Sequence, residues 1–92
     1  MKFTWDEKKR KANLEKHGLD FTLAERIFGA SDVVDILDTR CDYGEERHLA
    51  YATINNKKMC LCYVVREEAI RVISIRGVHE REWRKHYDNE IL

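Results

Sequence analysis

The sequence predicts one α+β domain in which two helices precede a four-stranded antiparallel sheet and a third helix follows it. Three observations carry this prediction. The 92 residues leave room for one hydrophobic core. The hydrophobic period changes from helical to alternating near residue 33 and becomes helical again near residue 78. No proline, low-complexity tract or internal repeat interrupts the chain, so residues 1–92 are treated as a single domain.

The first helix is predicted over residues 5–17. Thr4 and Glu7 have the spacing of a capping box, in which each side chain bonds an exposed backbone N–H at the start of the helix. Gly18 is a typical residue at a helix end, because glycine adopts the left-handed conformation without steric cost.

The second helix is predicted over Phe21–Phe28. Asp20 is a favourable N-cap and Gly29 a favourable terminator. The apolar residues of this segment share one helical face. They are Phe21, Ala24, Ile27 and Phe28.

Alternating apolar residues predict four strands. These are Val33–Leu37, Arg47–Ile54, Lys58–Val65 and Arg71–Ile75. Asn55-Asn56 predicts a tight hairpin, since asparagine tolerates positive φ, and Arg66-Glu67-Glu68 forms the next turn. Short turns make an antiparallel meander, and helical spacing resumes at Val78. Helices at the two ends of the chain can cover only parts of the sheet, so we expect one face to stay open as a working surface.

Charge is distributed unevenly along the chain, although 17 basic residues balance 17 acidic ones. Residues 1–17 hold six bases and three acids, residues 18–46 two bases and eight acids, and residues 47–92 nine bases and six acids. A phosphate ligand responds to a local basic face rather than to the average charge. The neutral total therefore does not exclude nucleic-acid binding.

Several classes of protein are disfavoured by the sequence. No apolar run resembles a signal sequence or approaches the roughly 20 residues of a membrane span, so we expect a cytoplasmic protein without a membrane partner. An odd number of cysteines favours free thiols. Cys60 and Cys62 share one strand face, and Cys41 or His48 could complete a metal set, but a single C-x-C is a weak zinc signal. We expect no metal site and no cofactor.

Four residues of the first helix recur every four positions and form one stripe. They are Trp5, Lys9, Asn13 and His17. The stripe could offer a ring for base stacking, a phosphate contact and a proton carrier. In the alternative interpretation, Trp5 packs into the core, Asn13 satisfies a backbone group, and Lys9 and His17 are solvated.

The basic residues of the second half are mostly arginines. They are Arg47, Arg66, Arg71, Arg76, Arg81 and Arg84. Arginine presents a planar fork that matches phosphate and stays charged at any relevant pH. Arg47, Arg66 and Arg76 lie at predicted strand ends, and strand ends can converge on one site. The alternative is a set of salt bridges with the neighbouring glutamates.

RNA can be cut without a metal ion if a base takes the 2′-hydroxyl proton, a cation stabilises the phosphorane and an acid protonates the leaving oxygen. Composition cannot choose among the candidate proton carriers. They are His17, Glu45, Glu46, His79, His86 and Tyr87.

Several motifs follow one another along almost the whole chain. They are Trp5-Asp6-x-x-Lys9-x-x-x-Asn13, Lys16-His17-Gly18, Tyr43-Gly44-Glu45-Glu46-Arg47, Tyr63-x-x-Arg66 and Arg71-Val72-Ile73-Ser74-Ile75-Arg76. In this order and at this spacing they resemble the BrnT family of bacterial toxins. The resemblance implies a RelE-like fold and a metal-independent ribonuclease toxin of a type II toxin–antitoxin pair. It also implies a BrnA-like antitoxin that binds the toxin and, through its own DNA-binding part, the operator DNA of the pair.

These residues and this resemblance together predict a catalytic site. Arg66 and Arg76 are predicted to hold the scissile phosphate, and Arg47 to assist. Proton transfer is assigned to Glu45, Glu46 and His17, and RNA binding to Trp5, Lys9, Asn13 and Tyr63. The alternatives are a non-catalytic module whose arginines bind RNA or an acidic antitoxin, and a stand-alone RNA-binding domain. With an antitoxin the protein is expected to form a hetero-oligomer.

Overall fold

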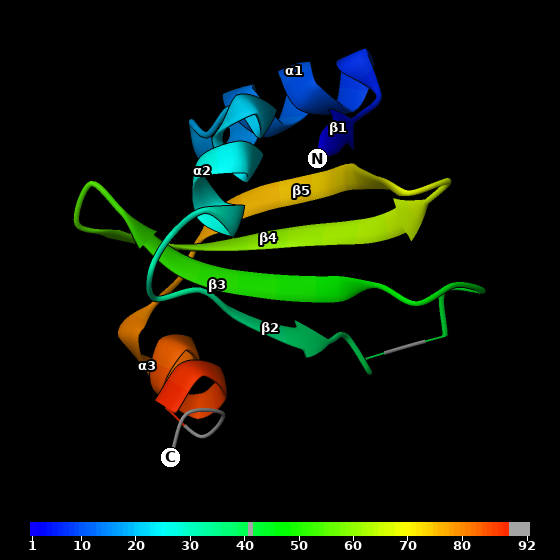
Figure 1. The fold of residues 1–92 in the computed structure, drawn as a ribbon. Helices are drawn as coiled ribbons and strands as arrows, with labels where there is room; N and C mark the ends of the chain where they lie inside the picture. The colour runs from blue at the N-terminus through cyan, green and yellow to red at the C-terminus, as the bar shows by residue number, and fades with distance from the viewer. Residues whose placement is uncertain (41, 89–92) are drawn as a thin grey trace.

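Five strands form one sheet with helices on both of its faces (Figure 1). The computed structural model describes residues 1–40 and 42–88, and the side chains of residues 87 and 88 are outside that description. The suggested roles of Cys41 and of the Tyr87 side chain therefore lie outside the described residues. The strands are β1 (Lys2–Thr4), β2 (Val34–Leu37), β3 (His48–Ile54), β4 (Lys57–Arg66) and β5 (Ala69–Gly77).

The strand order is β1-β5-β4-β3-β2, and the last four strands form the predicted antiparallel meander. β1 adds a parallel partner to β5, with Lys2 opposite Ala69 and Thr4 opposite Arg71. The sheet is therefore mixed and five-stranded, and the prediction of four antiparallel strands is wrong in this respect. Three residues are too few to show an alternating pattern, and their partner lies more than sixty positions away, so no local signal marks this strand.

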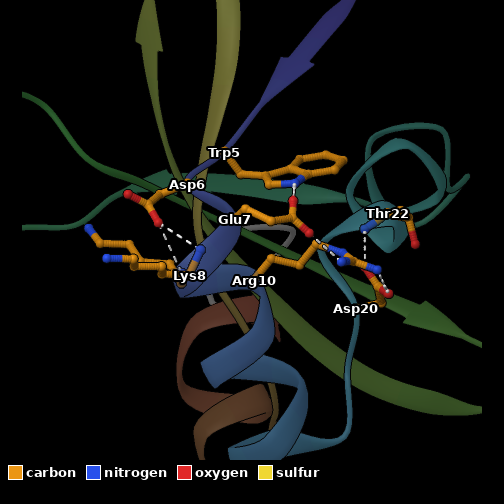
Figure 2. Close-up of polar contacts among 8 residues, drawn as sticks. Trp5, Asp6, Glu7, Lys8, Arg10, Asp20 and Thr22 are labelled. Carbon is orange, nitrogen blue, oxygen red and sulfur yellow. Dashed lines mark hydrogen bonds and ion pairs between the residues drawn. The ribbon is translucent and has the colours of Figure 1, made fainter.

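Helix α1 (Glu7–His17) begins two residues later than the proposed capping box requires. Asp6 is the N-cap, and its carboxylate accepts hydrogen bonds from the backbone of Lys8 at 2.8 Å and of Lys9 at 3.2 Å (Figure 2). Glu7 instead accepts a bond from the Trp5 indole. The capping box between Thr4 and Glu7 is thus wrong, because Thr4 is engaged in β1 and aspartate is an equally good cap.

The predicted end of α1 and the start of the next helix are confirmed. Gly18 is left-handed with φ 70°, and Asp20 caps a 3₁₀ turn, Phe21–Leu23, that leads into α2 (Ala24–Phe28). Asp20 also accepts two bonds of 2.9 Å from the Arg10 guanidinium (Figure 2). This pair fixes α1 against the start of the second helical segment.

Both tight turns of the meander use positive φ. Asn55 and Asn56 have φ 52° and 65°, which confirms the predicted hairpin. Glu67 and Glu68 adopt the same conformation, with φ 51° and 64°, between β4 and β5.

The two faces of the sheet carry separate cores. The α1/α2 face packs against both N-terminal helical segments and holds the larger core, with Phe21, Ile27, Leu61 and Ile75 fully buried. The opposite face, which we call the α3 face, holds a smaller core. Its buried members are Leu49, Tyr51, Cys60, Cys62 and Trp83.

The C-terminal segment covers only one end of the α3 face (Figure 1). Helix α3 (Glu80–Trp83) continues as a π-helical turn, Arg84–Asp88. Lys58 lies 5.4 Å from the centre of the Trp83 ring and pairs with Glu80, which fixes this segment at the end of the sheet that carries the β3–β4 hairpin. In the described residues the other end of the α3 face carries no helix, so the open surface is one end of a face and not the whole face that we expected. Among the described residues, no helix has the length and apolar character needed to cross a membrane.

Candidate active site

A pocket of about 400 Å³ lies on the α3 face, between the sheet and the C-terminal segment. Its polar lining comes from several elements: the loop after β2, strands β3 and β5, helix α3 and the π-helical turn. These side chains are Thr39, Arg40, Tyr51, Arg76, Glu82, Lys85 and His86. The pocket thus combines cations, a carboxylate and an imidazole.

Arg76 and Glu82 form the centre of this group. Arg76 Nη1 donates to Glu82 Oε1 at 2.8 Å and Nη2 donates to Oε2 at 2.6 Å, so the pair is bidentate. Tyr51 donates from its hydroxyl to the same carboxylate at 2.9 Å. Because α3 begins three residues after β5 ends, Glu82 turns back toward the strand that carries Arg76.

The environment fixes the charge of each of these three groups. The bonds from Arg76 lower the pKa of Glu82, against the opposing effect of burial, and Tyr51 lowers it further. Hydrogen bonding to Glu82 raises the pKa of Arg76, and burial raises the pKa of Tyr51. The site therefore holds a guanidinium, a carboxylate and a neutral phenol across the physiological range.

His86 lies beside this centre. Its ring stacks on that of Tyr51, with centroids 5.7 Å apart and planes 16° from parallel. An imidazole can accept and release a proton near neutral pH. His86 is partly exposed, so a ligand in the pocket can reach it.

Arg66 lies elsewhere, in an exposed pair with Glu45. The Nη2–Oε1 distance is 2.7 Å and the Nε–Oε2 distance is 3.3 Å. Arg47 stacks on the Tyr43 ring at 4.0 Å, and its Nε atom is buried without a hydrogen-bond partner among the described residues. Glu46 is exposed in the same loop.

The structure does not bring Arg66 and Arg76 together. Arg66 lies opposite Ala69, whereas Arg76 lies opposite Cys60, six positions earlier along β4. At about 3.3 Å per residue this separation is roughly 20 Å. Each guanidinium instead pairs with its own carboxylate, Arg66 with Glu45 and Arg76 with Glu82, so this structure does not form the predicted joint scissile-phosphate site.

The stripe on α1 divides in the way that the alternative interpretation described. Asn13 is buried and bonds the backbone of Leu19 and Ile75, and Trp5 packs against the larger core. Lys9 and His17 are exposed. α1 lies on the opposite side of the sheet from α3, so His17 cannot serve the pocket that holds Arg76 (Figure 1).

Tyr63 is also not available for base stacking. It is 5% exposed, packs edge-on against Phe28 and stacks on His48 at 5.0 Å. Its hydroxyl donates to Asp35, and burial raises its pKa. The structure therefore gives Tyr63 a packing role on the α1/α2 face.

Sequence reasoning did not single out Tyr51, Glu82 or Arg40. Glu82 follows Arg76 by six positions across a predicted strand-to-helix junction, and this spacing could have indicated a contact between the two side chains. Tyr51 shares a strand face with Leu49, so it reads as an ordinary core aromatic, and only its hydroxyl bond distinguishes it.

The two described cysteines do not add chemistry to the pocket. Cys60 and Cys62 are buried free thiols, and burial raises the pKa of Cys60 to about 12 and that of Cys62 in the same direction. A thiol must lose its proton to act as nucleophile or metal ligand. Across residues 1–40 and 42–88, no group of three or more His, Cys, Asp or Glu side chains is placed to hold a metal ion.

Comparison with curated proteins finds no match to this chain. The family model described as the ribonuclease toxin BrnT of type II toxin–antitoxin systems matches residues 5–82. The matched region includes the Arg76–Glu82 pair and Tyr51, and it ends before His86. Since the match spans most of the sequence and agrees with the ordered motifs, the chain belongs to the BrnT family of ribonuclease toxins of type II toxin–antitoxin systems.

Proposed function

We propose that this protein is a metal-independent endoribonuclease toxin and that it cleaves RNA in the pocket on the α3 face. The observation that carries the proposal is the bidentate Arg76–Glu82 pair beside His86 in that pocket. A rigid guanidinium supplies positive charge where a phosphorane develops, and an adjacent imidazole supplies a route for the proton.

In this mechanism His86 takes the proton of the RNA 2′-hydroxyl. The 2′-oxygen then attacks the neighbouring phosphorus, the bond from phosphorus to the 5′-oxygen breaks, and the leaving oxygen takes a proton from solvent. The products are a 2′,3′-cyclic phosphate and a 5′-hydroxyl. Arg76 stabilises the extra negative charge on the phosphorane oxygens.

Glu82 acts as a positioning residue. Its lowered pKa makes it a weak base, and its bonds hold the Arg76 guanidinium in one orientation. Tyr51 in turn holds Glu82. Fixing a catalytic cation before substrate arrives avoids a reorganisation cost during the reaction.

The biological setting follows from the family. We propose a BrnA-like antitoxin partner in the cytoplasm, a hetero-oligomeric inactive complex, and contact with operator DNA only through the antitoxin. We also propose that the sheet and its flanking helices are related to the RelE-like fold. The described arrangement of helices on both faces of a largely antiparallel sheet is compatible with this relation.

The test compares RNA cleavage and growth arrest for five proteins: wild type, Arg76→Lys, Arg76→Ala, His86→Gln and the exposed-lysine control Lys11→Ala. Losing one such donor costs about 2.7 to 4 kcal/mol of barrier in comparable sites, so we expect a hundredfold to thousandfold slower turnover for Arg76→Ala. Arg76→Lys keeps the charge and loses the fork, so it should restore RNA binding better than turnover.

Thermal melts separate loss of activity from loss of folding. Folded Arg76→Ala and His86→Gln proteins that cleave RNA at the wild-type rate would show that this pocket is not the active site. Wild-type protein that binds RNA and antitoxin without cleaving RNA would support the non-catalytic binding module instead.

A further inference from the structure

The uncovered end of the α3 face gathers three arginines around one carboxylate. Glu45 accepts both bonds from Arg66, and these bonds lower its pKa. Arg47 and Arg71 lie near enough to lower the pKa of Glu45 further. Glu45 is therefore bonded to one guanidinium and lies within electrostatic range of two more.

Lys2 adds one further cation at this end. In the described ranges the side chains of Lys2 and Arg71 form no hydrogen bond or ion pair, and Arg71 is partly buried. Both line a pocket of about 290 Å³ that also includes Arg66, with Glu67 as its acid. Lys2 and Arg71 are therefore cations without a direct ion pair, although the carboxylates of Asp6, Glu45 and Glu67 lie nearby.

This pocket lies on the same side of the sheet as Arg76. Side chains alternate along β4, so Arg66 shares a face with Cys60 and Cys62 of the smaller core. On β1, Phe3 packs into the larger core, so Lys2 points to the α3 face. A strand of RNA crossing this face can therefore meet both pockets.

We propose that Arg47, Arg66, Arg71 and Lys2 form a second phosphate-binding subsite for single-stranded RNA, and that Glu45 occupies the phosphate position when RNA is absent. This inference rests on the proposed function, because it takes RNA as the ligand of the α3 face. The subsite begins about four positions along β4 from the level of Arg76, where Arg71 lies opposite Val64, and ends about six positions away at Arg66. These steps correspond to roughly 13 to 20 Å, so it binds a phosphate on the same strand some nucleotides from the scissile one.

Exchange of Glu45 for a phosphate is physically reasonable. The Arg66 and Glu45 side chains are 50% and 33% exposed, and an exposed ion pair contributes little to stability. A phosphodiester presents two non-bridging oxygens to the arginine forks, as a carboxylate does, so it can take the place of Glu45. Once displaced, Glu45 still repels the bound phosphate, so removing its charge should strengthen RNA binding.

The experiment measures binding of the full chain to a fluorescent single-stranded RNA analogue whose 2′-hydroxyls are methylated, so that cleavage is not needed. Two lengths are compared: an oligonucleotide long enough to reach both pockets, and a dinucleotide that fills only the Arg76 pocket. The variants are Arg66→Ala, Arg71→Ala and Glu45→Gln, with Lys11→Ala as the control on the opposite face of the molecule.

We expect each arginine variant to bind the long RNA several-fold more weakly and the dinucleotide with unchanged affinity. The slope of log affinity against log salt should decrease by about 0.7 for each lost phosphate contact with single-stranded RNA. Glu45→Gln should bind the long RNA more tightly than wild type, and Lys11→Ala should match wild type.

Three results would overturn the inference. One is unchanged affinity and salt slope for both arginine variants. Another is a Glu45→Gln protein that binds RNA normally but does not cleave natural RNA, which would make Glu45 a proton carrier. The last is that the arginine variants bind the antitoxin more weakly but bind RNA as wild type does, which would make this end of the sheet a protein-binding surface. If the variants behave as expected but wild type does not cleave RNA, the subsite stands and the proposed activity fails.

Discussion

Replacing Asn13 by alanine should destabilise the fold, because its side chain acts as a substitute strand partner for β5. β1 pairs with β5 only as far as Arg71, so the outer edge of β5 beyond that point has no strand beside it. There Asn13 Nδ2 donates to the Ile75 carbonyl at 2.8 Å, and the Ile75 N–H donates to Asn13 Oδ1 at 3.2 Å. A third bond, of 2.9 Å, reaches the carbonyl of Leu19.

The size of the effect follows from what Asn13→Ala leaves behind. The N–H and C=O of Ile75 lose their partner inside the core, and each unsatisfied buried group costs about 1 to 3 kcal/mol. We expect a loss of about 3 kcal/mol, a large share of the roughly 5 to 15 kcal/mol of a small domain. At about 4 to 8 °C per kcal/mol, the melting temperature should fall by roughly 12 to 24 °C.

The assay is urea and thermal unfolding of Asn13→Ala beside Lys11→Ala, an exposed change on the same helix. Lys11→Ala should unfold close to wild type. RNA affinity is measured below the melting temperature of each protein. An Asn13→Ala protein as stable as wild type but weaker in RNA binding would refute the structural role and restore the predicted RNA contact.

Three other predictions concern metal dependence, pH and the partner. Purified protein should cleave RNA in EDTA, since the proposed chemistry uses only side chains; activity that chelation abolishes and zinc or magnesium restores would contradict this. Hydrogen bonds from Arg40 lower the pKa of the buried Asp38 to about 2. The ionised carboxylate therefore adds at most about 2 kcal/mol to the free energy of unfolding. This contribution is complete above about pH 4 and is lost as the pH falls from about 4 to 2. Asp38→Asn should therefore lower unfolding stability at pH 7 but much less at pH 2, and an equal deficit at both pH values would exclude the linkage. The antitoxin should cover the α3 face with acidic and apolar side chains, so hydrogen exchange in the complex should slow there, and protection confined to α1 and α2 would count against it.

The parts of the fold that follow from local chemistry could be predicted from the sequence. Gly18 ends α1, Asp20 caps the next turn, and Asn55-Asn56 form the hairpin, because each role depends on the conformational preference of one or two residues. The meander followed from the short turns between the strands. β1 depends on a partner far along the chain, and no preference within its three residues reveals it.

The site was less predictable, for a geometric reason. Arg66 ends β4 and Arg76 lies near the end of β5. Consecutive antiparallel strands run in opposite directions, so their last residues lie at opposite ends of the sheet along the strand direction. The predicted antiparallel meander therefore already implied that Arg66 and Arg76 lie far apart. Arg47 precedes β3 and Arg66 ends β4, so these two arginines lie at the same end of the sheet, where both lower the pKa of Glu45. The approach of Glu82 to Arg76 depends on the direction in which α3 leaves the sheet, which the sequence does not specify.

Both arginines that were predicted to hold the scissile phosphate hold a carboxylate, but the two pairs differ in how easily a phosphate could replace it. Glu82 also accepts a hydrogen bond from the Tyr51 hydroxyl. The side chains of Arg76 and Glu82 are each only 28% exposed. Among the described residues, Glu45 accepts side-chain hydrogen bonds only from Arg66, and it does so on a more exposed surface. An arginine that must keep one orientation during a reaction benefits from the first arrangement, because its carboxylate stays in place when substrate arrives. An arginine that binds and releases an RNA strand benefits from the second, more exposed arrangement. Its affinity for a phosphate depends on the difference in free energy between the arginine–phosphate pair and the arginine–carboxylate pair, and a single charge change can adjust that difference. The contrast in burial therefore assigns catalysis to Arg76 and reversible RNA binding to Arg66 within the proposed function.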